Sequence, residues 1–194
     1  MKGHSAPVKS IAFNSDGSLL VSSGDDKYVK IWDVEKRRFI QSFKGDPIGD
    51  SSDKENKFQG HQNWVRSAQF SLDSRMVASG SDDRTVKLWD VVQGSGIHTF
   101  HDHSGMVNDV KFHPDGSCLA SCSTDKKIKI FDVRSNRLLQ HYDAHDKAVN
   151  SVSFHSNGQF LVSSSDDATI KIWDLRMGQI LYTLFGHDGP STTA

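Results

Sequence analysis

The sequence is organised by one cassette that recurs four times behind a histidine. Its second copy, VASGSDDRTVKLWD at 77–90, places two short β-type runs around a polar Asp-Asp turn, which is the pattern of a β-hairpin. The separation between the histidine and the aromatic residue of the last dipeptide is identical in every copy: His4 and Trp32, His61 and Trp89, His103 and Phe131, His145 and Trp173. A spacing held four times predicts a fold assembled from equivalent repeats.

The repeats occupy the chain as one region, residues 1–194, with four units at about 4–45, 61–102, 103–144 and 145–186. Each unit predicts four short strands, because apolar residues alternate with period two and there is no helical stripe. The interval between cassette histidines is constant from His61 through His103 and His145 to His187, but the interval from His4 to His61 is longer. We assign the extra length of that first interval to an inserted polar loop at 46–60, and 187–194 to the start of a truncated fifth repeat.

The first turn of unit two departs from the repeat. Its residues are SLDSR (71–75), whereas the other units have Asp-Gly or Asn-Gly at this place. Those dipeptides suit tight turns that need a left-handed residue. We therefore expect a looser turn in unit two.

Composition excludes several classes of partner. The chain has 23 Lys+Arg against 24 Asp+Glu, so no global field attracts nucleic acid or an anionic membrane. The mean hydropathy is −0.52, and no apolar run approaches the roughly 20 residues that span a bilayer. The first residues, MKGHSAPVKS, lack the apolar region of a signal peptide. Cys118 and Cys122 are expected to be reduced thiols of a cytosolic protein.

Two kinds of chemistry are suggested by residue types and rejected by their pattern. Histidine, serine and aspartate recur in every unit and resemble a nucleophilic triad, but a catalytic site is needed once, so four equivalent copies indicate a structural role. The histidines at 98, 101, 103, 141 and 145 have ligand-like spacing, yet that spacing gathers a metal on a helix, and these segments are strands and loops. We expect no catalytic residue, no metal and no cofactor.

A Gly-His dipeptide, some two dozen residues and then Trp-Asp, repeated at the constant interval that separates His61, His103 and His145, resembles the WD40 repeat over the whole chain. The resemblance implies an all-β fold of β-propeller blades, each a four-stranded antiparallel sheet. Four blades lie at the lower end of the roughly 4–8 that propellers contain. An open arc or partial propeller is the favoured arrangement, with pairing to a second chain through exposed end blades and a closed ring of four as alternatives.

The resemblance also implies a hydrogen-bonded network in each blade, in which the Trp indole donates to Ser, Ser to His, and His to Asp. Its members are His4, Ser22, Asp26, Trp32; His61, Ser79, Asp83, Trp89; His103, Ser121, Asp125, Phe131; and His145, Ser163, Asp167, Trp173. Phe131 has no N–H, so the third network should be weaker by about 1 kcal/mol. Phe131→Trp is then expected to raise the melting temperature.

A lysine recurs two residues before each cassette aromatic, at positions 30, 87, 129 and 171. These lysines could form a basic stripe for acidic tails or nucleic acid. A solvated or locally paired strand face beside the acidic turns is the favoured interpretation.

In WD40 proteins the side chains third and fifth after the histidine, and the one before the network Asp, face the narrow end of the propeller. Carried over by position, the implied partner-binding residues are Lys9, Asp25, Trp64, Arg66, Asp82, Met106, Asn108, Asn150 and Asp166, with Pro7, Thr124 and Ala148 at the remaining positions. Trp64, Arg66 and Met106 are of types enriched at binding hot spots. Packing of Trp64 at the blade edge is the alternative. Alanine at both Trp64 and Arg66 is expected to leave the fold intact and abolish binding.

Three stretches resemble the centriolar family called "proteome of centriole one": 61–90, FDVRSNRLLQHYDAHDKAVNSVSFH (131–155) and GQILYTLFGHDGPSTTA (178–194). The resemblance implies a non-catalytic scaffold for centriole assembly or stability and cilium formation. It also implies centriolar, cytoskeletal or microtubule-associated protein partners, in the cytoplasm and cytoskeleton, at the centrosome or basal body. Only four repeats and no heptad segment are present. The alternatives are a generic WD40 adaptor, such as a ubiquitin-ligase substrate receptor or a signalling scaffold, and a disfavoured propeller hydrolase.

Overall fold

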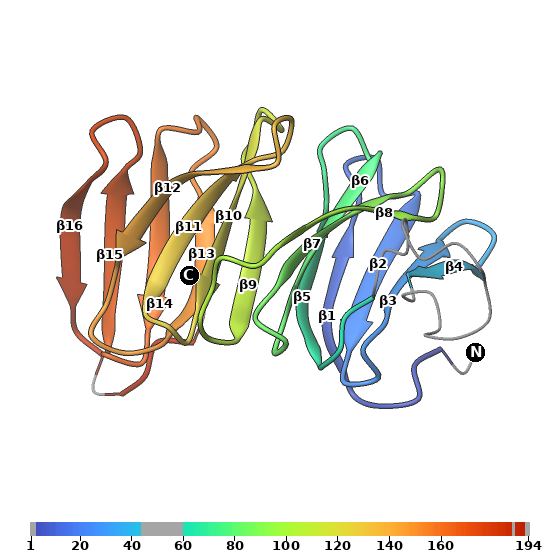
Figure 1. Ribbon diagram of the computed structural model, residues 1–194, viewed down its shortest axis with the longest axis horizontal. Helices are drawn as coiled ribbons and strands as arrows, with labels where there is room; N and C mark the ends of the chain where they lie inside the picture. The colour runs from blue at the N-terminus through green and yellow to red at the C-terminus, as the bar shows by residue number, and fades with distance from the viewer. Residues whose placement is uncertain (1–2, 44–59, 188, 193–194) are drawn as a thin grey trace.

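The computed structural model describes residues 3–43, 60–187 and 189–192, and within them the chain forms four antiparallel sheets of four strands (Figure 1). The all-β fold of WD40-type blades is therefore confirmed. Among these residues, no helix has the length and apolarity needed to cross a membrane. The predicted loop at 46–60 lies, apart from Gly60, outside the described residues.

Within every sheet the strands are hydrogen-bonded in chain order. Sheet one contains β1 (Val8–Phe13), β2 (Leu19–Gly24), β3 (Val29–Asp33) and β4 (Arg38–Phe43). Sheet two contains β5 (Val65–Phe70), β6 (Met76–Ser81), β7 (Val86–Asp90) and β8 (Gly96–Phe100). Sheet three contains β9 (Val107–Phe112), β10 (Cys118–Ser123), β11 (Lys127–Asp132) and β12 (Arg137–Asp143). Sheet four contains β13 (Val149–Phe154), β14 (Phe160–Ser165), β15 (Thr169–Asp174) and β16 (Gln179–Phe185).

The turn between the first two strands is equally tight in sheets one and two, so the expected loosening of SLDSR is wrong. In sheet two, Ser71 N–H donates to Met76 O at 2.8 Å and Ser74 N–H donates to Ser71 O at 3.0 Å. The matching bonds from Asn14 and Gly17 in sheet one are 3.1 and 3.2 Å long. Ser74 takes the place of the glycine by adopting a φ of 60°. The two backbone hydrogen bonds offset the cost of that left-handed conformation.

The apolar core consists of three clusters, each at the junction of two successive sheets. At every junction the cassette aromatic of one sheet packs on the last-strand aromatic of the sheet before it. The ring centroids are 5.0 Å apart for Trp89 and Phe43, 4.3 Å for Phe131 and Phe100, and 5.0 Å for Trp173 and Tyr142. Aromatic pairs at such distances add to the free energy gained from burial. The period of the sequence repeat is therefore also the period of the core.

The first strands β1, β5, β9 and β13 pack on one another in that order. A buried carboxylate joins three of them, because Asp109 of β9 accepts the hydroxyl of Ser67 in β5 at 2.7 Å and that of Ser151 in β13 at 3.0 Å. The stack does not close into a ring: β1–β4 lie at one end and β13–β16 at the other (Figure 1). The fold is an open arc, with the first strand of each sheet next to its successor.

Candidate protein-binding face

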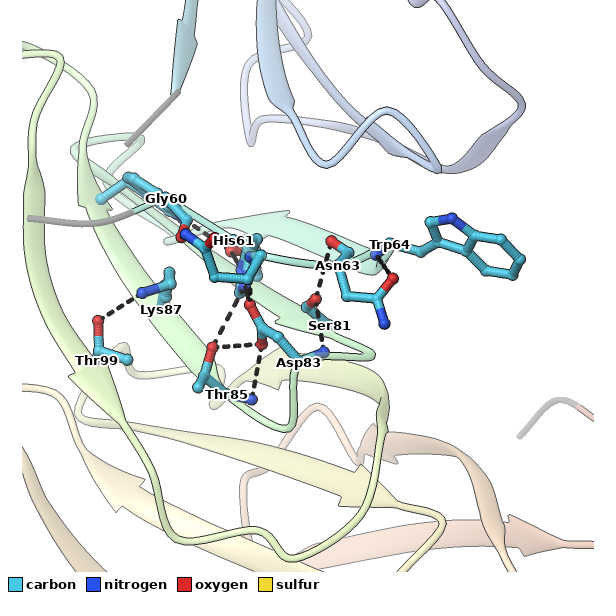
Figure 2. A network of polar contacts seen from close by, with 12 residues as sticks. Gly60, His61, Asn63, Trp64, Ser81, Asp83, Thr85, Lys87 and Thr99 are labelled. Atoms are coloured by element: carbon cyan, nitrogen blue, oxygen red, sulfur yellow. Dashed lines mark hydrogen bonds and ion pairs between the residues drawn. The ribbon is translucent and has the colours of Figure 1, made fainter. Parts of the chain in front are cut away.

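The four amino-acid types of the repeat meet in one chain of hydrogen bonds, here called the polar clamp. In sheet two, Trp89 Nε1 donates to Ser79 Oγ at 2.8 Å, and Ser79 Oγ lies 2.7 Å from His61 Nε2. His61 Nδ1 lies 2.8 Å from Asp83 Oδ2 (Figure 2). A carboxylate only accepts, so Nδ1 carries the proton and the serine hydroxyl donates to Nε2. The clamp thus links the loop before β5 to β6, to β7 and to the turn between β6 and β7.

Sheets one and four contain the same clamp. The distances from indole to serine are 2.8 and 2.9 Å, from serine to histidine 2.7 and 2.8 Å, and from histidine to aspartate 2.8 Å in both. Sheet three has His103, Ser121 and Asp125 at 2.7 and 2.8 Å, but Phe131 adds no hydrogen bond. Phe131 is fully buried and stacked on Phe100, so the larger indole of Phe131→Trp would also have to displace that ring.

The structure adds two members to the clamp that the sequence analysis did not assign. Thr85 and Thr169 each donate their hydroxyl to the clamp carboxylate at 2.6 Å. Lysines 30, 129 and 171 each donate Nζ to the carbonyl of the residue before the clamp histidine, and Lys87 donates to Thr99 at 2.9 Å. The recurring lysines are therefore engaged within their own sheets and do not make an exposed basic stripe. The constant place of these lysines, two residues before the cassette aromatic, is the sequence feature that could have predicted their contacts.

The pKa shifts and the burial of the clamp residues are those expected of a structural network. Burial alone would raise the pKa of the Asp83 carboxyl, but hydrogen bonds from His61 and Thr85 outweigh it and hold the pKa far below its usual range. Burial lowers the pKa of His61 despite the opposing effect of Asp83. Ser79 is fully buried, and its hydroxyl oxygen already accepts a hydrogen bond from the indole of Trp89. A nucleophile in this position cannot reach a substrate.

At the opposite end of the first strands from the SLDSR-type turns, one backbone hydrogen bond recurs in all four sheets. The residue before the clamp aspartate donates its N–H to the carbonyl of the third residue after the histidine. The bonds join Asp25 to Pro7, Asp82 to Trp64 and Thr124 to Met106 at 2.9 Å, and Asp166 to Ala148 at 3.0 Å. The twelve narrow-face positions therefore recur in the same local geometry in each sheet.

Side chains from all four sheets line one depression at this face, with a volume of about 330 Å³. Its walls are formed by Lys9, Arg66, Asn108, Asn150, Asp166 and Thr192. Five of the nine predicted binding residues are thus brought together. Thr192 was not predicted, although it is the fifth residue after His187, the position that Lys9 holds after His4.

Most polar side chains of the face are paired with a residue of their own sheet. Lys9 Nζ lies 3.3 Å from Asp25 Oδ2, and Arg66 forms a two-point ion pair with Asp82. Asn150 donates to Asp166 at 2.7 Å, whereas Asn108 donates to the carbonyl of Val149 at 2.8 Å. The face therefore carries one ion pair from sheet one and one from sheet two. In sheet four the carboxylate of Asp166 is paired with the amide of Asn150.

Trp64 and Met106 are the large apolar side chains of the face, 45% and 38% exposed. The Trp64 indole points away from the polar clamp (Figure 2), and Lys9 Nζ lies 5.6 Å from its ring centroid. Arg66 is less suited to mutation than expected. Asp82 is only 8% exposed, so Arg66→Ala would leave a buried carboxylate without its cation. Trp64 and Met106 are the better probes of binding.

The residues described hold no group of three or more His, Cys, Asp and Glu side chains arranged for a metal. Both cysteines are free thiols, and burial raises the pKa of Cys118 to about 11 and that of Cys122 well above its usual value. Such thiols are poor nucleophiles and poor ligands near neutral pH.

Successive four-stranded blades, each closed by a polar clamp, and a lined depression at one end of their first strands define a propeller-type repeat protein, a class whose domains generally bind other proteins. The family model "WD domain, G-beta repeat" matches residues 1–33, 52–90, 94–132 and 136–174. The chain belongs to the WD40 repeat family. This fold is typically a non-catalytic interaction domain.

The similar proteins are diverse. The chain is 31% identical over 118 residues to a WD repeat domain-containing protein 83 homolog of Dictyostelium discoideum, covering 47% of this chain and 36% of that protein. It is 34% identical over 97 residues to the nuclear distribution protein PAC1 of Arthroderma otae, covering 46% and 18%. It is 35% identical over 89 residues to the human WD repeat and SOCS box-containing protein 1, covering 45% and 18%. The chain thus spans no more than 36% of the length of these relatives.

Proposed function

We propose that this chain is a scaffold that binds a protein partner at the narrow face, through Trp64, Met106 and the depression between the four sheets. The depression carries the proposal, because side chains equivalent by repeat position converge on it from every sheet. An aromatic and a thioether side chain beside paired charges match the composition of protein–protein interfaces. The clamp serines are buried, which favours binding over catalysis.

The proposed setting is the centriole or the basal body, with centriolar or cytoskeletal proteins as partners. It is supported by the three stretches at 61–90, 131–155 and 178–194 that resemble the centriolar family. The competing proposal is a generic WD40 adaptor, which the diverse names of the relatives favour. A tagged chain that concentrates at centrioles supports the first, and a diffuse distribution in cells with intact centrioles contradicts it.

Partner binding is tested with Trp64→Ala combined with Met106→Ala. We expect capture of centriolar proteins from extracts by the tagged chain to fall at least about tenfold, since exposed anchors of this kind contribute on the order of 1–2 kcal/mol each. Val92→Ala is the matched control, because Val92 is 84% exposed between β7 and β8 and lies outside the face. Unchanged capture by the double variant, with the control behaving as wild type, would reject the narrow face as the binding site.

A further inference from the structure

The two ends of the arc expose surfaces that are buried at every junction inside it. In β1, Val8, Ile11 and Phe13 are 49%, 66% and 62% exposed. Their counterparts in β5 are Val65, Ala68 and Phe70, at 0%, 2% and 5%, and those in β9 are equally buried. With Trp32 of β3, these three residues form what we call the leading face, the surface that the preceding sheet covers at internal junctions.

Sheet four exposes the complementary surface, the trailing face, formed by Ile170, Ile172 and Leu184. Leu184 is 49% exposed, whereas the residues at its position in the other sheets, Phe43, Phe100 and Tyr142, are at most 8% exposed. Each of these three packs on the cassette aromatic of the following sheet. By the same geometry, the side chain that would cover Leu184 is an aromatic residue at the position of Trp32. One chain therefore carries both surfaces of a junction, the leading face at one end of the arc and the trailing face at the other.

Residues 189–192 already occupy one corner of the trailing face. Asn150 donates to the carbonyl of Ser191 at 2.9 Å, as Asn108 donates to that of Val149 at 2.8 Å at the preceding junction. Ser191 N–H also donates to Ser165 O at 3.0 Å, and Ser191 is 5% exposed. Ser191 is the fourth residue after His187, as Val149 is after His145 and Val8 after His4. It therefore holds the place that Val8 of another sheet would take.

We propose that two copies of this chain pair head to tail, the leading face of each against the trailing face of the other, and that residues 189–192 compete with this pairing. Two copies provide two identical junctions related by a twofold axis, so the association closes. The ring of eight blades is within the roughly 4–8 that propellers contain. Leu184 of one copy packs on Trp32 of the other. The Val8 carbonyl of the second copy replaces the Ser191 carbonyl as the acceptor of the hydrogen bond from Asn150 of the first.

The test measures the mass of the purified chain by analytical ultracentrifugation over a range of concentrations. We expect a monomer–dimer equilibrium in the full chain. Ile11→Asp with Phe13→Asp puts charge on the leading face, and Leu184→Asp puts it on the trailing face. Each is expected to weaken pairing at least about tenfold, because a charge is forced into an apolar junction. All three side chains are exposed in the single chain, so its melting temperature should change little. Val92→Asp is the control.

Mixing the two kinds of variant distinguishes head-to-tail pairing from other dimers. Each variant alone lacks both junctions, but the mixture restores one, between the intact trailing face of the first and the intact leading face of the second. We expect a 1:1 heterodimer in the mixture, weaker than the wild-type dimer. A dimer that survives in either variant alone, or a mixture that stays monomeric, would overturn the head-to-tail arrangement. A wild-type chain that stays monomeric at every concentration would overturn the pairing itself.

Ser191→Glu tests the competition, because the buried position of Ser191 rejects a charge and the segment should leave the trailing face. We expect tighter pairing than in the wild type, and unchanged or weaker pairing contradicts the competition. Partner capture through Trp64 and Met106 is read separately, on residues that belong to neither the leading nor the trailing face. Failure of the pairing and failure of the proposed binding face are thus distinguishable results, because they are read on different variants, even though Thr192 of the 189–192 segment lines the depression.

Discussion

The clamp serine makes different hydrogen bonds in sheet two and in sheet three. Ser79 accepts a hydrogen bond from Trp89 and donates one to His61, whereas Ser121 contacts only His103 among its clamp partners. Ser79→Ala removes two buried hydrogen bonds, and Ser121→Ala removes one. We expect Ser79→Ala to lower the free energy of unfolding by about 1 kcal/mol more than Ser121→Ala, measured by urea denaturation. Equal losses would show that the indole bond contributes nothing.

The clamps make the free energy of unfolding decrease as the pH falls. The pKa values of His61 and His145 lie below their usual 6.5, mainly through burial, so the unfolded chain takes up protons first as the pH falls. This stability is complete above about pH 6.5 and is lost as the pH falls through the lower folded values. The pKa of Asp125 is lowered to about 2, because hydrogen bonds from His103 and neighbouring amides outweigh burial. Its contribution is complete above about pH 4 and is lost as the pH falls toward 2.

We therefore expect the urea midpoint to fall from pH 7 to pH 5 and again from pH 4 to pH 3. His61→Gln removes one of the titrating groups, so its midpoint should change less between pH 7 and pH 5 than that of the wild type. A midpoint that stays constant or rises on acidification would contradict the neutral state of the buried histidines.

At the scale of the element, the hairpin turns tolerate a conformation that their residues disfavour. The residue after each clamp aspartate is left-handed, with φ of 71° at Lys27, 70° at Arg84, 70° at Lys126 and 65° at Ala168. The aspartate holds the turn by accepting the N–H two residues on, as from Thr169 to Asp167 at 3.0 Å. The DD and TD pairs of the cassette predicted a polar turn, but the backbone handedness follows from the closure of the hairpin.

Ala168 is the cleanest site for testing that strain. Ala168→Gly removes the steric cost of the left-handed conformation at the expense of a more flexible unfolded chain, for a net gain of up to about 1 kcal/mol in the free energy of unfolding. Ala168→Val adds a β-branched side chain at positive φ and should destabilise the protein. Thermal denaturation of the two variants measures both effects, and a Val variant as stable as the Gly variant would exclude strain at this turn.

At the scale of the whole molecule, the open arc makes stability uneven. Sheets two and three have both faces covered, whereas sheets one and four have one covered face each. In stacked repeats each unit is stabilised by its neighbours, so the end sheets should open more often. We expect amide hydrogens of β6 and β10 to exchange at least about tenfold more slowly than those of β2 and β14 in dilute monomer, which corresponds to about 1.4 kcal/mol of opening free energy. Uniform protection would indicate a closed ring.

The constant spacing from histidine to aromatic, and the constant interval from His61 through His187, were sufficient to predict the repeats and their strands, and the resemblance to WD40 repeats supplied the positions expected to share a face. This information is local or periodic, and hydrogen bonds within a hairpin follow directly from it. The sequence did not reveal that SLDSR forms a normal turn, because Ser74 is held by a backbone hydrogen bond to Ser71, which is itself bonded to Met76 at the start of β6. It also did not assign Lys30, Lys129 and Lys171 to the carbonyls before the clamp histidines, since that contact exists only after the sheet has formed.

By itself, the sequence determined that the chain is a stack of equivalent four-stranded sheets, because each repeat carries the residues for its own strands and turns; its resemblance to WD40 repeats implied the polar clamps. Only the tertiary structure decided which equivalent residues differ in exposure. Val8 and Val65 hold the same place in the repeat, yet one is 49% exposed and the other fully buried. The reason is physical: burial depends on whether a neighbouring sheet covers the residue, and a periodic pattern does not state this.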